Sequence, residues 1–165
     1  MGFSGSFIIA RSDRPLMELA SLQASGIKPV RCARDGQWQI LEASPGGDPD
    51  PSIVAETGAP VLVAHVVFSD FAAVEAHGPS GVSWRCAMPA VVAREYEFPE
   101  EWIGVPADVT RQAVRWAGEA GQRPDPPAVR AVLSVAEHGE AEGLVHDLAH
   151  ALGFQFRDEA LPDPS

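Results

Sequence analysis

Apolar and polar positions alternate along short segments in the first half of the chain, and this period of two predicts β-strands. Residues 6–12 (SFIIARS) are a short segment rich in β-forming residues, and residues 70–78 and 81–88 look like two further strands joined by a turn. Residues 60–68 (PVLVAHVVF) are instead apolar on both faces. A strand without a polar face is typical of the centre of a sheet, where both faces are covered.

A β-hairpin is predicted where two alternating segments flank Asp35-Gly36. Asp-Gly is a preferred two-residue loop of type I′, because both loop positions need a positive φ. In the segment that follows the loop, the alternation sets Trp38 and Ile40 on one face and Leu41 on the other. Gln37 and Gln39 share the face of Leu41.

The pattern changes to a helical period after residue 89. Residues 106–121 repeat apolar positions at helical spacing between a proline and a glycine, which favour the start and the end of a helix. Two further helices are predicted at residues 125–139, capped by Asp125, and at residues 140–152. Shorter helices are expected at residues 15–23 and 89–98. A further short helix is expected between Asp50, as its N-terminal cap, and Gly58, as its end.

Strands followed by helices predict the α+β class. We expect an antiparallel sheet of about five strands from the N-terminal half, with the C-terminal helices packed on one face. A chain of 165 residues fits one domain, so residues 1–165 are assigned to a single domain. Within it we distinguish a strand-rich part (residues 1–89), a helical part (residues 90–157) and a polar tail (residues 158–165).

The net charge of -11 is distributed unevenly. Residues 1–89 carry six basic and nine acidic side chains, whereas residues 90–165 carry six basic and fourteen acidic ones. Nucleic acids and anionic membranes bind clustered lysine and arginine side chains, so both are excluded as expected partners. The acidic second half indicates either a solubilising surface or a docking surface for a basic protein partner. Nothing in the chain indicates an oligomeric state.

The two cysteines, Cys32 and Cys86, lie far apart in strand-like segments. Two are too few for a disulfide scaffold, and the N-terminus lacks the basic start and the apolar segment of a secretion signal. No apolar run approaches the roughly 20 residues that a membrane helix needs. We therefore predict buried, reduced thiols in a cytoplasmic protein. Eleven arginines against one lysine are typical of a GC-rich genome and indicate a bacterial origin.

A pair of histidines in the last predicted helix, His146 and His150, is the clearest chemical motif. In the H-E-x-x-H pattern, two histidines four residues apart bind zinc from one helix face, and the intervening glutamate activates the metal-bound water. With Gly153 in place, residues 146–156 resemble the extended signature of the metzincin proteases. The resemblance implies a zinc-dependent hydrolase.

The segment departs from that signature in two ways. Asp147 replaces the glutamate with a shorter side chain, and Phe156, which cannot bind a metal, stands at the third ligand position. Little chain follows to build the far wall of a cleft. At 100° per residue, the helix also places both histidines opposite its apolar stripe. That stripe consists of Leu144, Val145, Leu148 and Leu152. Two exposed histidines are therefore the expectation, and a metal site is the alternative.

Other polar residues interrupt apolar segments. His65 lies among valines in the predicted central strand, and Asp70 follows that strand. We expect a buried, hydrogen-bonded His65 and a turn or bulge at Asp70, with a pocket that holds either residue as the alternative. His77 is expected to be exposed, and the paired carboxylates Glu100 and Glu101 to be solvated.

The chain has no phosphate-binding glycine loop, no nucleophile elbow and no Cys-x-x-Cys pair. The sequence therefore favours a non-enzymatic protein that acts through protein contacts, as a regulator or as an immunity-like inhibitor that presents carboxylates to a basic enzyme. One alternative is a metal-dependent hydrolase that uses His146 and His150, with zinc as its only cofactor. The other is a small-ligand-binding protein with a pocket between sheet and helices.

Overall fold

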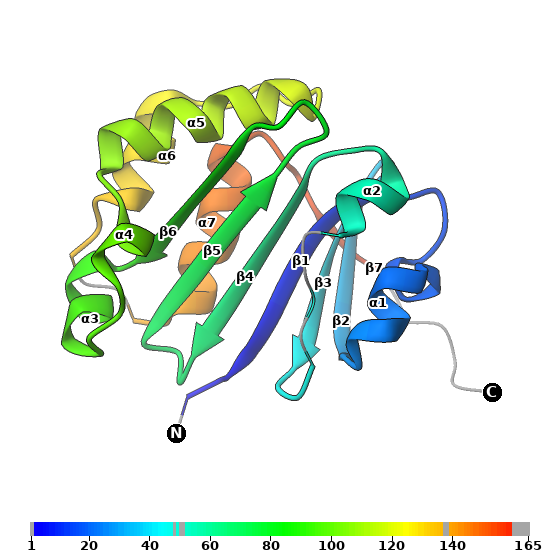
Figure 1. The fold of residues 1–165 in the computed structure, drawn as a ribbon, viewed down its shortest axis with the longest axis horizontal. Coiled ribbons are helices and arrows are strands. Elements are labelled where there is room, and N and C mark those ends of the chain that lie inside the picture. The colour runs from blue at the N-terminus through cyan, green and yellow to red at the C-terminus, as the bar shows by residue number, and fades with distance from the viewer. Residues whose placement is uncertain (1, 48, 50–51, 137–138, 160–165) are drawn as a thin grey trace.

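A seven-stranded sheet forms the centre of the computed structural model, which describes residues 2–47, 49, 52–136 and 139–159 (Figure 1). All neighbouring strands are antiparallel, in the order β6-β5-β4-β1-β3-β2-β7. The strands are β1 (Gly5–Arg11), β2 (Lys28–Asp35), β3 (Trp38–Ser44), β4 (Val61–Val67), β5 (Phe71–His77), β6 (Ser83–Met88) and β7 (Arg157–Glu159). The predicted α+β class is confirmed, with seven strands in place of about five.

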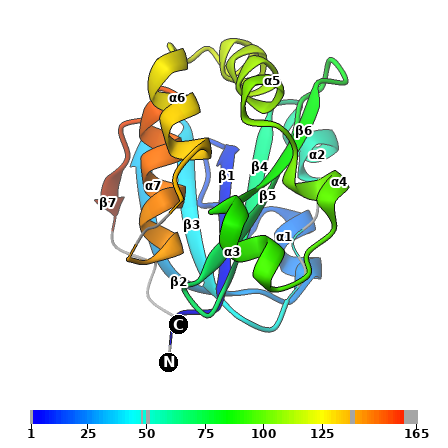
Figure 2. The same cartoon turned by 90° about the vertical axis from the view of Figure 1, so that its left-hand side faces the viewer.

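Helices cover both faces of this sheet (Figure 2). The helices are the 3-10 helix η1 (Leu16–Glu18), α1 (Ala20–Ser25), α2 (Ile53–Thr57), α3 (Ala90–Glu95), α4 (Glu100–Ile103), α5 (Pro106–Glu119), α6 (Pro126–Leu133) and α7 (Ala141–Ala151). The apolar side chains of α5, α6 and α7 pack on one face, as predicted for the C-terminal helices. The short helices η1 to α4 lie against the opposite face, which the prediction left uncovered. None of the helices in the described ranges is long and apolar enough to cross a membrane.

Strand alternation explains why both faces are apolar. In β1, Phe7 and Ile9 join the core beneath α5, α6 and α7, whereas Ile8 and Ala10 join the core beneath α1 and α2. Successive side chains of a strand point to opposite faces, so a strand covered on both sides needs apolar residues at every position. The predicted central strand, residues 60–68, is confirmed as β4, which lies between β1 and β5.

The cover of the second face is divided. Leu16, Leu22 and Ile53 anchor η1, α1 and α2 over β1 and its neighbours. Farther along the sheet, Phe71 and Ala87 pack with Ala93 of α3 and Ile103 of α4. The β4–β5 register pairs Val67 with Phe71 and Val63 with Glu75, so these two groups of helices lie on the same face. A polar strip of the sheet remains between them.

Three local predictions need correction. The hairpin loop is Gly36-Gln37, because Asp35 pairs with Trp38, and only Gly36 has a positive φ, of 62°. This arrangement fits a type II′ loop, with glycine at its first position, and not the predicted type I′. Asp35 stays in the strand, where its carboxylate Oδ2 accepts a hydrogen bond of 3.0 Å from the main-chain N–H of Gln155.

The predicted polar tail begins too early. Ala33 of β2 pairs with Asp158 of β7, so the first residues of the tail form an edge strand and its remainder, residues 160–165, lies outside the described residues. Pairing satisfies main-chain groups that the edge of β2 would otherwise expose. The helix expected after Asp50 begins at Ile53 and ends at Gly58, whose φ is 66°. Asp50 itself lies outside the described residues.

Both cysteines are buried and form no disulfide with each other, as predicted. Complete burial raises the pKa of Cys86 to about 12, because the thiolate loses its hydration. Neither thiol has the exposed, electropositive surroundings of a reactive cysteine. They therefore belong to the packing of the sheet.

Candidate functional site

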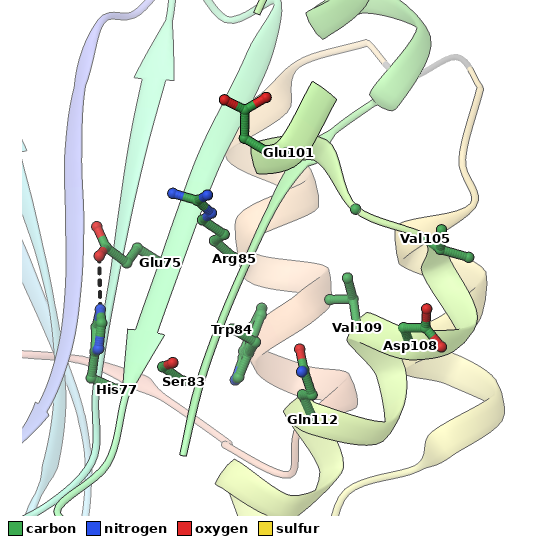
Figure 3. A pocket seen from close by; sticks show the side chains of 11 residues that line it. Glu75, His77, Ser83, Trp84, Arg85, Glu101, Val105, Asp108, Val109 and Gln112 are labelled. Carbon is green, nitrogen blue, oxygen red and sulfur yellow. Dashed lines mark hydrogen bonds and ion pairs between the residues drawn. The ribbon is translucent and has the colours of Figure 1, made fainter. Parts of the chain in front are cut away.

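A cavity of about 520 Å³ lies beside the edge strand β6, where α4 and α5 meet the polar strip of the sheet (Figure 3). We call it the acidic cavity. Its lining residues are Glu75, His77, Ser83, Trp84, Arg85, Glu101, Gly104, Val105, Asp108, Val109 and Gln112. A cavity of this size is within the range that small molecules or protruding side chains occupy.

The floor of the acidic cavity consists of polar side chains from two paired strands. Glu75 is directly opposite Arg85, and His77 is directly opposite Ser83, so all four side chains share one face. His77 Nε2 and Glu75 Oε1 are 2.7 Å apart, and the two side chains are each 32% exposed. The expectation that His77 is exposed needs correction, because its side chain is only partly exposed and is bonded to Glu75.

Hydrogen bonds from α5 hold this end of the cavity in place. The indole N–H of Trp116 donates to the carbonyl oxygen of His77 at 3.0 Å. In the β5–β6 turn, the main-chain N–H and the hydroxyl of Ser80 donate to the two carboxylate oxygens of Glu119, at 3.0 and 2.5 Å. The wall formed by α5 is therefore tied to the floor at two points.

The α4 wall is attached to β6 through Trp102. Its indole N–H donates to the carbonyl oxygen of Cys86 at 3.1 Å, which satisfies a main-chain acceptor of the edge strand. The guanidinium carbon of Arg85 lies 4.9 Å from the centre of the Trp102 ring, a cation–π contact. Glu101, the residue before Trp102, thereby reaches the mouth of the cavity (Figure 3).

Three carboxylates face the cavity from three different elements: Glu75 from β5, Glu101 from α4 and Asp108 from α5. Glu75 is bonded to His77, and Asp108 pairs with Arg111 one helical turn away. Within the described ranges, neither Glu101 nor Arg85 makes an ion pair with another residue. The described lining residues of the cavity include these three carboxylates and one guanidinium, that of Arg85. The cavity is therefore acidic on balance, with one cation at its floor.

Trp84 adds an unsatisfied donor. It is 4% exposed and packs edge-on against Trp116, with ring centres 6.2 Å apart. Its indole N–H is buried and has no acceptor in the described part of the chain. An unsatisfied buried donor costs about 1–3 kcal/mol, so such groups are rare and each calls for an explanation.

The predicted histidine helix is confirmed in its geometry. Leu144, Val145, Leu148 and Leu152 are buried, and His146 and His150 are exposed. No three histidine, cysteine, aspartate or glutamate side chains among residues 2–159, masked positions apart, are grouped so that they could hold a metal ion. Contrary to expectation, the residues after α7 do build a far wall: the two histidines and residues 154–157 border a cavity of about 530 Å³.

His65 and Asp70 lie away from the acidic cavity and apart from each other. Nδ1 of His65, which is half-buried, lies 3.1 Å from the hydroxyl of Ser6, its partner on β1. Asp70 is exposed in the β4–β5 turn, as predicted, where its main-chain N–H donates to Val67 O at 2.8 Å. Its carboxylate accepts a hydrogen bond from the Tyr96 hydroxyl, which raises the pKa of Tyr96.

The sequence contains one signal for the acidic cavity, although it matches no known motif. Glu75 and His77 are two residues apart in a strand that is otherwise apolar, so they form a polar strip on one face. Glu101 was recognised only as solvated, and Asp108 was not singled out. Comparisons with protein-family models, with curated proteins and with solved structures found no match to this chain.

Proposed function

We propose that this protein is a non-enzymatic binding protein, and that a cationic side chain of a basic protein partner enters the acidic cavity. The convergence of Glu75, Glu101 and Asp108 from three elements around one cavity carries the proposal. A partly enclosed site weakens the screening by water, so carboxylates there attract a cation more strongly than on an open surface.

The other groups of the cavity define what must accompany the cation. The Arg85 guanidinium, which makes a cation–π contact with Trp102, has no hydrogen-bond acceptor in the described ranges. A free amine would leave it unsatisfied. An arginine or lysine in an extended peptide or loop brings main-chain carbonyl oxygens beside its charge, and these can accept hydrogen bonds from Arg85. The preferred ligand is therefore a basic segment of a protein.

The charge of the whole molecule supports such an encounter. At a net charge of -11, the protein attracts a basic partner over distances longer than a hydrogen bond and accelerates its association. An immunity-like inhibitor, which presents carboxylates to the basic active site of an enzyme, is one concrete form of this function. A regulator that binds a basic segment of its target is the other.

A peptide of alternating glycine and arginine, acetylated and amidated at its ends, tests the proposal by isothermal titration calorimetry. We expect binding that is stronger at about 0.01 M than at about 0.15 M ionic strength, because salt screens the attraction. Glu101→Gln and Asp108→Asn should each weaken binding about fivefold, which corresponds to about 1 kcal/mol.

Glu18→Gln is the matched control, because Glu18 is an exposed acid on η1, outside the cavity, and the substitution changes the net charge by the same amount. It should leave the affinity for the peptide unchanged. Equal weakening by Glu18→Gln and Glu101→Gln would mean that the peptide senses only the net charge, and the proposal would be rejected. The same conclusion follows if a glycine–glutamate peptide binds equally well.

A further inference from the structure

The second cavity, which we call the histidine cavity, lies beside α7 and is separate from the acidic cavity. It measures about 530 Å³, and α7 contributes His146, Ala149 and His150 to one wall while residues 154–157 form the other. Among the residues that the structure describes, no acidic side chain lines it. In a chain of net charge -11, this distinguishes it from the acidic cavity and indicates a different kind of ligand.

A flat aromatic surface forms part of the histidine cavity. The rings of Phe154 and Phe156 stack 5.2 Å apart, with 8° between their planes. Phe154 is 1% exposed and is held edge-on by Trp38 at 5.3 Å, so the stack rests on the core of the sheet. Phe156 is only partly buried and presents the outer surface of the stack. Rigid, flat surfaces of this kind favour a planar ligand.

Two imidazoles supply the polar groups. His146 and His150 are one helical turn apart on α7, and the ring of His146 packs edge-on against Phe7 at 5.2 Å. Within the described ranges, neither imidazole makes a hydrogen bond or an ion pair. A neutral imidazole offers one donor and one acceptor, so the pair can recognise both kinds of group on the edge of a ring.

Arg157 also borders the cavity, but its side chain is not expected to contact the ligand. In β7 it pairs with Arg34, whose neighbour Ala33 belongs to the core beneath α7. Alternation along the strand therefore directs the side chains of Arg34 and Arg157 to the opposite face. The ligand is recognised by rings and imidazoles and not by a fixed cation.

We infer that the histidine cavity binds a small planar heteroaromatic compound, which stacks on Phe156 and exchanges hydrogen bonds with His146 and His150. The volume suits one to three fused rings, since small-molecule sites measure about 300–1,000 Å³. This site is independent of the proposed partner contact, because its ligand is apolar with polar edges and that of the acidic cavity is a cation. Either proposal can therefore be rejected while the other stands.

Benzimidazole is the probe, and indene, which has the same shape without ring nitrogens, is its matched control. Binding to the full chain is followed by the ¹H–¹³C spectra of the histidine and phenylalanine rings in labelled protein. We expect benzimidazole to shift the signals of His146, His150 and Phe156 selectively, and indene to bind at least fivefold more weakly, because one net hydrogen bond is worth about this factor.

His150→Gln and Phe156→Leu should each weaken benzimidazole binding about fivefold. Phe68→Leu is the control, because Phe68 is an exposed phenylalanine in the β4–β5 turn that does not line the cavity. His150 is exposed, so its variant keeps the fold. The inference is overturned by equal binding of indene and benzimidazole, by unchanged affinity in the His150 variant, or by the absence of shifts at about 5 mM probe, which is above a Kd of about 1 mM and a binding free energy of about -4 kcal/mol.

Discussion

The two faces of the sheet are covered in different ways, and this difference locates the acidic cavity. On one face, α5, α6 and α7 bury a continuous apolar core that reaches from Trp38 to Met88. On the other face, two groups of short helices leave a strip of the sheet between them. The continuous core buries one face of the sheet, whereas the divided cover leaves polar side chains of the other face accessible.

A single strand shows both situations. In β5, Val74 and Ala76 point toward the continuous core and are 0% exposed. Glu75 and His77, which alternate with them, point toward the divided face and remain about one-third exposed, at 32% each. Alternation of side chains thus turns one strand into core on one side and the floor of the acidic cavity on the other.

The largest expected effect comes from removing the ring of Trp116, which is 0% exposed and belongs to the continuous core. We expect Trp116→Ala to lower the free energy of unfolding by about 3–5 kcal/mol, measured by urea denaturation, because it leaves a large cavity. It also leaves the carbonyl oxygen of His77 without its donor.

Leu22→Ala provides the comparison for the divided face. Leu22 is the buried residue of the short helix α1 and is 0% exposed, and this helix can relax into the space that the substitution leaves. We expect a loss of about 2 kcal/mol, at the low end for buried leucines. If Leu22→Ala lowered the free energy of unfolding as much as Trp116→Ala, the two faces would contribute equally to stability, contrary to this prediction.

An intermediate effect is expected at Gly104, which joins α4 to α5. Its φ of 74° and ψ of 175° lie in a region that essentially only glycine occupies. A Cβ there would lie 2.8 Å from Cγ2 of Val109. Gly104→Ala should therefore lower the free energy of unfolding by about 1–3 kcal/mol, measured by urea denaturation. It should also weaken binding of the glycine–arginine peptide, because α4 and Glu101 would move.

Gly118→Ala is the matched control for this prediction. Gly118 lies in α5, and a Cβ at this position meets open space. Alanine there should stabilise the helix by about 0.5–1 kcal/mol. A Gly104→Ala variant that is as stable as Gly118→Ala would show that the junction of α4 and α5 does not need its left-handed backbone.

The smallest expected effect concerns the cap of α1 on the divided face. Glu56 of α2 accepts hydrogen bonds from the hydroxyl of Ser21 at 2.6 Å and from the main-chain N–H groups of Ala20 and Ser21 at 2.8 Å. The Ser21 hydroxyl bond is the largest cause that lowers the pKa of Glu56. Glu56→Gln should cost about 0.5 kcal/mol, since the carboxylate is exposed and well solvated.

The pH dependence of this small effect has a definite sign. Because the pKa of Glu56 is lower in the folded than in the unfolded protein, its carboxylate stabilises the fold above the unfolded value of about 4.3. This contribution is lost as the pH falls through the folded pKa. The melting temperatures of wild type and Glu56→Gln should differ by about 1–2 °C at neutral pH and converge in acid. A difference that grows below pH 4 would contradict the assigned bonds.

Local patterns predicted the elements well because they depend on neighbouring residues. The helical period between residues 140 and 152 was sufficient to assign Leu144 and Leu148 to the core and His146 and His150 to the surface, as observed. The position of the hairpin loop failed by one residue. That failure has a distant cause, because Asp35 is retained in β2 and its carboxylate binds the main chain of Gln155.

The sites depended on contacts that no local pattern contains. Glu75, Glu101 and Asp108 are separated along the chain and follow no motif, so only the packing of α4 and α5 against β6 could group them. The far wall beside His146 and His150 has a similar origin: the chain after α7 turns back, and Phe156 stacks on Phe154.

By itself, the sequence determined the α+β class, the strands β1 to β6, the apolar stripe of α7 and the burial of both cysteines. These follow from periodicity and hydrophobicity, which act over a few residues. Only the tertiary structure decided the strand order, the pairing of β7, the cover of the second face and the two cavities. Each of these depends on groups distant in the chain, whose mutual placement is set by packing and by the need to pair buried polar atoms.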